Sequence, residues 1–252
     1  MNPIILDERL SAAAELAREA LAGREAPVAA GVGCDHGFLT AKLLETVPGL
    51  TMLASDVSAP SLEKARRLLG ARGLSERANI TVADGLSAVD RPVDAVMILG
   101  MGAGTILKIV AEGREKIGGA ALIVQANVDL PLLRGGLAEL GFAIQKEVYC
   151  RAAGRHYVTM LARAGEAEMP DERRLMLGAC ADGVQTAAQY DYLAWQRGVR
   201  VREMLLQAGT DTPRAKERLL TGGHELNRIA EAIGMNTVSY THLRAHETCA
   251  DL

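Results

Sequence analysis

The chain has 252 residues, of which 49% are hydrophobic and 3% aromatic, and its formal net charge is −3. This length allows one α/β domain with an appendage, whose core must be built from Leu, Val, Ile and Ala. No segment approaches the roughly 18 consecutive apolar residues that cross a bilayer, and the four scattered cysteines, without a C-x-x-C pair, predict neither a bound metal nor a disulfide framework. Asp7 and Glu8 also stand where a signal peptide would be basic and then apolar, so we expect a cytoplasmic protein without a membrane partner.

The first informative segment is A-G-V-G-C-D-H-G-F-L, residues 30–39. It joins a short apolar run over residues 28–32 to a segment with helical character over residues 37–47. This pattern predicts a strand of an α/β sheet followed by a glycine turn, where the backbone can approach a ligand closely. The G-x-G-x-x-G spacing of a nicotinamide site is absent. We therefore predict a nucleotide-like cofactor at this turn, with Gly33, Asp35 and His36 as contacts.

Three later apolar runs end in acids or glycines. Residues 51–56 end in Asp56, about 20 residues after the glycine turn, the position from which α/β domains reach ribose hydroxyls. Residues 80–83 lead into an Asp-Gly pair and residues 95–99 into G-M-G. Ligands of open parallel sheets bind outside the carboxyl ends of the strands, so we expect one shared site. The further candidate contacts are Asp56, Val57, Asp84, Gly85, Gly100, Met101 and Gly102.

Two of these strand ends also have a simpler interpretation. Asp84-Gly85 alone is typical of a turn, and the segment from Asp56 to Ser58 could cap a helix over residues 59–71. Cys34 could look like a nucleophile, but a small side chain in a tight loop explains it without one, since no base is paired with it. The coincidence of four such strand ends is what favours a binding site.

Together these segments resemble the TrmK family of tRNA (adenine-N1)-methyltransferases, which use S-adenosylmethionine. The resemblance runs through most of the chain and is carried by L-D-E-R-L (6–10), G-C-D-H-G-F-L (33–39), A-S-D-V (54–57), A-D-G-L (83–86), I-L-G-M-G (98–102) and I-V-Q-A-N (123–127). It implies a Rossmann-like class I methyltransferase sheet, S-adenosylmethionine as cofactor, and methylation of adenine N1 in the D-loop region of tRNA.

Two positions depart from the family pattern. The family usually places an acid, which helps to orient the methionine end of the cofactor, where this chain has Gly31, so Asp35 would have to take over part of that work. Ala126 stands where the family more often has proline in Q-P-N, which loosens the backbone ahead of Asn127 but leaves its side chain available.

Asp35 and Asn127 are the predicted catalytic residues. Attack by a neutral ring nitrogen on a sulfonium methyl needs no strong base, so positioning does most of the catalysis. A carboxylate at Asp35 would stabilise the positive charge that develops on the purine, and the Asn127 amide suits recognition of the adenine N6 amino group. His36 could act as a general base or could equally be structural. Because N1 is normally base-paired, the target nucleotide must be unpaired or flipped out.

A chain with a net negative charge needs local basic clusters to bind a phosphate backbone. Arg151, Arg155 and His156 fall on a β-hairpin predicted over residues 142–162, and Arg197 and Arg200 fall on a C-terminal helix. We predict that these residues bind RNA. A solvated helix face or loop would explain each cluster equally well.

The C-terminal third predicts a second domain. After a methyltransferase domain over residues 1–165, apolar residues recur at helical spacing over residues 184–208, and Leu219, Leu226 and Ile233 lie seven apart beyond residues 209–213. This pattern predicts an antiparallel, coiled-coil-like helical hairpin over residues 170–237, which could hold tRNA or serve as a dimerisation arm. The oligomeric state stays open, a monomer included.

Residues 238–252 begin V-S-Y-T-H-L-R-A-H-E-T, which looks like a translated sequencing adapter and is expected to be a non-native tail. Two other functions remain compatible with the sequence. A small-molecule methyltransferase would bind the cofactor and ignore tRNA, whereas a catalytically impaired homologue would bind tRNA and leave the base unmodified.

Overall fold

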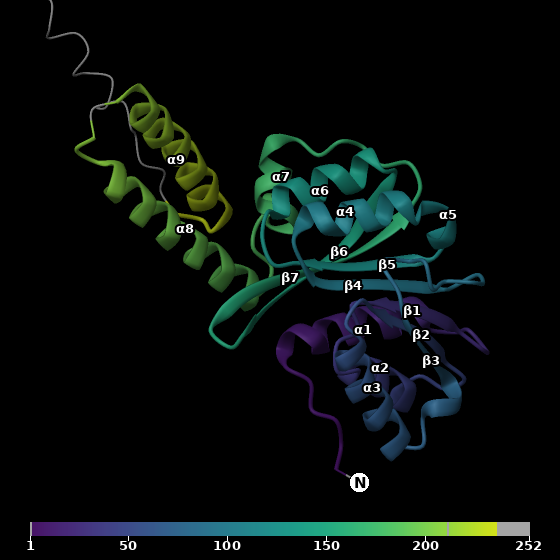
Figure 1. Cartoon of the computed structure of the whole chain (residues 1–252). Helices are drawn as coiled ribbons and strands as arrows, with labels where there is room; N and C mark the ends of the chain where they lie inside the picture. The colour runs from purple at the N-terminus through teal and green to yellow at the C-terminus, as the bar shows by residue number, and fades with distance from the viewer. Residues whose placement is uncertain (1, 211, 236–252) are drawn as a thin grey trace, which may run out of the picture. The chain divides into compact units, whose positions relative to one another are not determined.

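A computed structural model of the chain describes residues 2–210 and 212–235. The chain divides into two compact units, Met1–Met176 and Leu177–Leu252 (Figure 1). The predicted non-native tail, residues 238–252, lies outside the described residues. No helix in the two described ranges has the length and apolarity needed to cross a membrane.

The first unit is built on one seven-stranded sheet with the strand order β3-β2-β1-β4-β5-β7-β6. Strands β1 to β5 run parallel, and β7 pairs antiparallel with both β5 and β6. This arrangement confirms the predicted Rossmann-like sheet that ends in a hairpin. The strands are β1 (Val28–Val32), β2 (Thr51–Asp56), β3 (Ala78–Val82), β4 (Ala95–Met101), β5 (Ala121–Ala126), β6 (Phe142–Ala152) and β7 (Arg155–Ala164).

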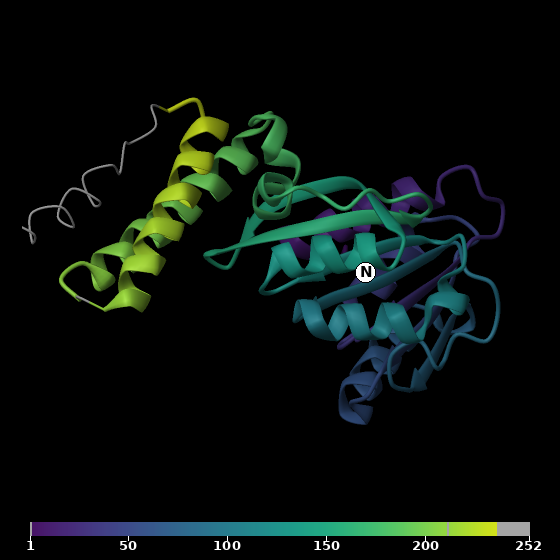
Figure 2. The ribbon, with the colours of Figure 1, turned by 90° about the horizontal axis from the view of Figure 1, so that it is seen from above.

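Helices cover both faces of this sheet, as the two views in Figures 1 and 2 show. On one face α1 (Glu8–Leu21), α2 (Phe38–Thr46) and α3 (Ala59–Ala71) lie over the strands. On the other face lie α4 (Ala103–Glu112), α5 (Arg114–Ile117), α6 (Leu130–Glu139) and α7 (Glu172–Leu177). Small and aliphatic side chains fill the core beneath α1 and α2, among them Ala17, Leu43, Leu50, Met52 and Ile123, as the shortage of aromatic residues required.

Two predicted strands end at different residues in the structure. The third strand was expected over residues 80–83 but runs from Ala78 to Val82, because its bounds follow pairing with β2 from Met52↔Ala78 to Asp56↔Val82. The fourth was expected to end at Leu99, whereas β4 continues to Met101 through an irregularity at Gly100. Strands β1 and β2 and helix α3 have the predicted bounds.

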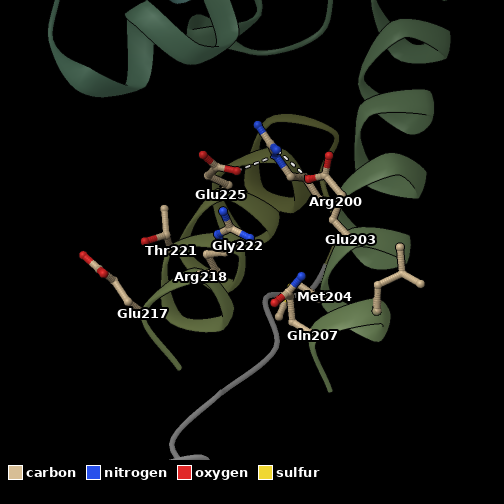
Figure 3. Close-up of a pocket in the computed structure, with 10 residues that line it drawn as sticks. Arg200, Glu203, Met204, Gln207, Glu217, Arg218, Thr221, Gly222 and Glu225 are labelled. Atoms are coloured by element: carbon tan, nitrogen blue, oxygen red, sulfur yellow. Dashed lines mark hydrogen bonds and ion pairs between the residues drawn. The ribbon is translucent and has the colours of Figure 1, made fainter. Parts of the chain in front are cut away.

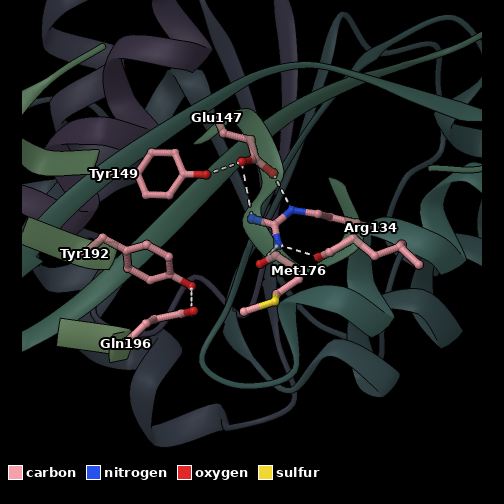
Figure 4. A network of polar contacts seen from close by, with 7 residues as sticks. Arg134, Glu147, Tyr149, Met176, Tyr192 and Gln196 are labelled. Carbon is pink, nitrogen blue, oxygen red and sulfur yellow. Dashed lines mark hydrogen bonds and ion pairs between the residues drawn. The ribbon is translucent and has the colours of Figure 1, made fainter. Parts of the chain in front are cut away.

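A buried ion pair ties α6 to the sheet (Figure 4). Arg134 in α6 is 1% exposed, and its Nε donates to Glu147 Oε1 in β6 at 2.6 Å. The hydroxyl of Tyr149 donates to the same carboxylate, and Arg134 Nη1 donates to the carbonyl oxygen of Leu175 at 2.8 Å. Because the charge and its hydrogen-bonding groups are satisfied inside the fold, this network holds the C-terminal turn of α7 to α6 and β6.

The second unit contains the predicted antiparallel helical hairpin, formed by α8 (Ala187–Gln207) and α9 (Pro213–Ala232). A capping box between Thr186 and Gln189 starts α8, and the hydroxyl of Thr212 caps α9 ahead of Pro213. At the helix contact Gly222 packs closely against Met204, since a Cβ there would lie 3.0 Å from Met204 Cγ. A side chain at this position would fit only if Met204 moved by a few tenths of an ångström.

Candidate functional site

A cavity of about 390 Å³ lies at the carboxyl ends of β1, β2 and β4. Its volume falls within the range of about 300–1,000 Å³ that small-molecule sites occupy. Six predicted site residues line it together: Gly33, Asp35, His36, Asp56, Gly100 and Met101. The remaining lining includes Arg9 from α1 and Phe38 from α2, neither of which the sequence singled out. The parallel sheet thus brings residues from separate strands to one edge, as expected from its topology.

The turn after β1 is shaped by two residues with left-handed backbone. Gly33 has φ +68°, and a Cβ at this position would lie only 2.6 Å from Met101 Cε, so no side chain fits without displacing Met101. Asp35 adopts φ +48°, a region that residues other than glycine rarely occupy. The Asp35 N–H donates to Asp56 Oδ2 at 3.0 Å, which ties this turn to the end of β2.

Asp56 holds two backbone segments at once. Besides the bond from Asp35, its Oδ1 accepts from the Ser58 N–H at 2.8 Å. The cap of α3 is made by the Ser58 hydroxyl, which accepts from Ser61 N–H, and not by Asp56 itself. An ionised carboxylate has about four lone-pair sites, so Asp56 keeps acceptor capacity toward the cavity that it lines.

His36 lies between the carboxylate of Asp35 and the ammonium group of Lys64. Its Nδ1 is 2.7 Å from Asp35 Oδ2, and its Nε2 is 2.9 Å from Lys64 Nζ in α3. An ammonium group can only donate, so Nε2 must accept and the imidazole proton must sit on Nδ1, where it is donated to Asp35. Both ring nitrogens are therefore engaged, an arrangement that favours the structural role for His36. Lys64 was not predicted, because a lysine on an amphipathic helix looks like a surface residue.

Asn127 lies one residue beyond β5 and is exposed. Its Nδ2 donates to the Gly100 carbonyl at 2.7 Å, and its Oδ1 accepts from Gln125 Nε2 at 3.2 Å. Gln125 in turn accepts from the Gly100 N–H and from Arg9. Sequence analysis missed Gln125 and Arg9 as site residues, although both fall in segments that carry the family resemblance, I-V-Q-A-N and L-D-E-R-L.

The other predicted cofactor contacts lie near the same sheet edge but do not line the cavity. Val57 follows β2 and is 69% exposed. Asp84 and Gly85 form the turn after β3, where the Ser87 hydroxyl donates to the Asp84 carbonyl and the Ser55 hydroxyl to the Gly85 carbonyl. Gly102 precedes α4 as its N-terminal cap residue. Their proposed contacts with a cofactor remain predictions.

Cys34 lines the cavity without the properties of a nucleophile. Burial, followed by the negative charges of Asp56 and Asp35, raises the pKa of its thiol to about 11. The thiol is therefore protonated at neutral pH, and thiols react as thiolates. No group of three His, Cys, Asp or Glu side chains that could hold a metal ion occurs within residues 2–210 and 212–235.

The predicted RNA-binding residues occupy two places. Arg151 pairs across the β6–β7 hairpin with His156, and Arg155 with Ala152, next to the turn at Ala153 and Gly154; both arginines are exposed. In the second unit Arg200 in α8 forms ion pairs with Glu203 at 2.7 Å and with Glu225 in α9 at 2.5 Å (Figure 3). Arg197 is half-buried on α8. The charge of Arg200 is thus already engaged in pairing the two helices.

Comparison with known proteins identifies the family. Residues 29–217 match the family model TrmK, described as tRNA (adenine(22)-N(1))-methyltransferase. The chain belongs to this family. The match begins in β1 and ends in α9, so it includes the sheet edge with its cavity and reaches into the helical hairpin.

Individual relatives agree with the family assignment. The tRNA (adenine(22)-N(1))-methyltransferase of Bacillus subtilis is 27% identical over 168 residues, which cover 66% of this chain and 68% of that protein. The crystal structure of B. subtilis TrmK shares the fold with a TM-score of 0.76 at 22% identity, covering 91% of this chain and 99% of that one. A structure from Streptococcus pneumoniae, solved in complex with S-adenosyl-L-methionine, has a TM-score of 0.73 at 24% identity and covers 91% and 100% of the two chains.

Proposed function

We propose that this protein transfers a methyl group from S-adenosylmethionine to N1 of an adenine in the D-loop region of tRNA. The observation that carries the proposal is the family match, which spans the strand ends that form the cavity. The family description names adenine 22 of tRNA as the methylated base. Because the substrate is tRNA, we expect the protein to act in the cytoplasm.

The residues of the cavity fit S-adenosylmethionine. Gly33 and Gly100 leave backbone exposed at two strand ends, and Asp56 offers carboxylate oxygens of the kind that accept ribose hydroxyls. Met101 and Phe38 supply apolar surface, the latter at 49% exposure. When bound, the cofactor supplies an electrophilic methyl group on a sulfonium. We assign its binding to Gly33, Asp56, Gly100 and Met101, with Val57, Asp84, Gly85 and Gly102 beside them.

Asp35 is the residue that we assign to charge stabilisation. Its carboxylate is held by His36 Nδ1, and the Lys64 ammonium fixes the tautomer that donates this hydrogen bond. A carboxylate oriented in this way, at the cavity, would stabilise positive charge on a methylated purine. The Asn127 amide would hold the adenine edge. The exposed Arg151 and Arg155 on the hairpin, together with His156, Arg197 and Arg200, are our candidates for contact with the RNA backbone.

The test is transfer of labelled methyl groups from S-adenosylmethionine to unmodified tRNA transcripts by the wild-type chain. A transcript in which guanosine replaces the target adenosine serves as the matched control. Incorporation into the first transcript only supports the proposal. Transfer to small-molecule acceptors but to neither transcript would contradict it.

A second candidate, a tRNA-binding homologue with impaired catalysis, is favoured by Gly31. This residue is buried in β1, and a Cβ added there would lie 3.7 Å from Met52 Cε, an ordinary contact. Gly31→Asp can therefore restore the family acid without backbone strain. Calorimetric titration with S-adenosylmethionine separates the two functions, because the impaired homologue would bind only as the Gly31→Asp variant.

A further inference from the structure

The G-M-G segment contains a β-bulge at Gly100, whose backbone groups form hydrogen bonds with side chains. Leu99 pairs with Gln125 and Met101 pairs with Ala126, so Gly100 is an extra residue in β4 with no partner in β5. Such a bulge removes backbone groups from the ladder, and each needs another hydrogen-bond partner. Gly100 has φ +76°, a left-handed backbone conformation that glycine adopts without steric cost.

Two side chains of the β5 end supply the missing partners. Gln125 Oε1 accepts from the Gly100 N–H at 3.1 Å, and Asn127 Nδ2 donates to the Gly100 carbonyl at 2.7 Å. The Asn127 N–H donates to the carbonyl of Met101 at 2.8 Å. The shape of the G-M-G turn and the direction of the Asn127 side chain are therefore set together.

The orientation of Gln125 follows from the chemistry of its partners. It is completely buried, and its Oε1 also accepts from Arg9 Nη1 at 3.3 Å. A backbone N–H and a guanidinium can only donate, so both must face the oxygen, and the NH₂ group must point to Asn127 Oδ1. Arg9 is itself held in place, since its guanidinium lies over the Tyr157 ring, 5.7 Å from the centroid.

We propose that Gln125, anchored by Arg9, is a positioning residue that fixes the amide of Asn127 and the G-M-G turn for methyl transfer. This inference rests on the proposed function and adds two residues to its site. Asn127 keeps one amide hydrogen and one oxygen lone pair beyond these bonds, and its exposure leaves them open to a base. Without Gln125 the amide can rotate, and the donor and acceptor no longer face a fixed direction.

The decisive variant is Gln125→Glu. A carboxylate can still accept from Gly100 and Arg9, but it presents an oxygen to Asn127 Oδ1 in place of the NH₂ donor, so the link to Asn127 is lost. Misplacement of a positioning group can cost on the order of 100-fold in rate. We expect kcat for tRNA methylation to fall by about tenfold to 100-fold. The Kd of S-adenosylhomocysteine should change by less than about threefold.

Thr159→Val is the matched control. Thr159 pairs with Gln125 in the neighbouring strand β7, and its buried hydroxyl has no hydrogen-bond partner in the described part of the chain. Its removal disturbs the same place without breaking the chain of bonds, so kcat should stay at the wild-type value. Arg9→Lys, which keeps a donor for Gln125 Oε1, should retain more activity than Arg9→Met.

Two results would overturn the inference. One is a Gln125→Glu variant with the kcat of Thr159→Val. The other is a Gln125→Glu/Asn127→Ala double variant in which the increase in activation free energy, obtained from kcat, equals the sum of the increases in the two single variants. Residues that act as one unit give increases that do not add in this way.

A spectroscopic readout keeps this test separate from the proposed function. The side-chain amide signals of Asn127, identified by their loss in Asn127→Ala, should shift in Gln125→Glu and not in Thr159→Val. If the wild-type chain methylates no tRNA, the proposed function fails, and these signals still decide whether Gln125 orients Asn127. Unshifted Asn127 signals in Gln125→Glu would refute the positioning role whatever the activity.

Discussion

Gly33→Ala tests the link between the glycine turn and the cofactor cavity. The substitution forces an alanine into φ +68°, which costs about 1–2 kcal/mol of folding stability. It also places a Cβ 2.6 Å from Met101 Cε, whereas carbon atoms pack at about 3.5–4.0 Å, so Met101 must move by about 1 Å. Met101 lines the cavity, and its displacement changes the space that we assign to the cofactor.

Gly23→Ala is the control for this prediction. Gly23 has φ +77°, and a Cβ there meets nothing within 4 Å, so the variant has the same backbone strain without a steric contact. Both variants should lose about 1–2 kcal/mol in urea denaturation. Only Gly33→Ala should bind S-adenosylmethionine at least about tenfold more weakly in calorimetry, equivalent to about 1.4 kcal/mol. In the Met101→Ala background, which lacks the clashing methyl group, Gly33→Ala should weaken binding by less than it does in the wild-type background. Equal affinities of the two single variants, or an equal effect of Gly33→Ala in both backgrounds, would refute the steric argument.

Three further results are expected. Arg134→Met leaves the Glu147 side chain, 2% exposed, without its cation and should destabilise the fold by about 3–5 kcal/mol in urea denaturation; a loss below about 1 kcal/mol would contradict a structural role for the pair. Burial and the charges of Asp56 and Asp35 raise the pKa of Cys34 to about 11, so about one thiol in a thousand is ionised at pH 8. The rate of Cys34 alkylation, measured by mass spectrometry, should therefore rise with pH up to about 11. A rate that levels off near pH 9 would contradict the raised pKa. Replacing Arg151 and Arg155 together by alanine should reduce the salt dependence of tRNA binding, measured by fluorescence anisotropy, by about two in log–log slope; an unchanged slope would exclude the hairpin as a phosphate-binding surface.

The parallel strands that form the cavity were predictable because local sequence decides them. Residues 28–32 and 51–56 are short apolar runs that end in turn or acidic residues, and both became strands with the predicted bounds. Strand β3 lies at the edge of the sheet and is only partly buried, so its ends follow from pairing with β2. Hydropathy alone could not place them.

Site residues at strand ends could be predicted from the sequence, whereas those that depend on contacts between distant parts of the chain could not. Asp56 is the last residue of β2, Gly33, Asp35 and His36 follow β1, and the parallel sheet brings these strand ends together. Arg9 reaches Gln125 across 116 positions of the chain, and on its own helix it looks like a solvated charge. The bulge at Gly100 could not be anticipated either, because it depends on the register between β4 and β5.

Primer extension on tRNA after incubation with the wild-type chain and S-adenosylmethionine tests the central claim most directly, because N1-methyladenine blocks base pairing and stops reverse transcription. The proposed function predicts a stop at one D-loop adenine that depends on cofactor and disappears in the transcript with guanosine at that position. Full-length extension after incubation with folded protein that binds S-adenosylmethionine would contradict it.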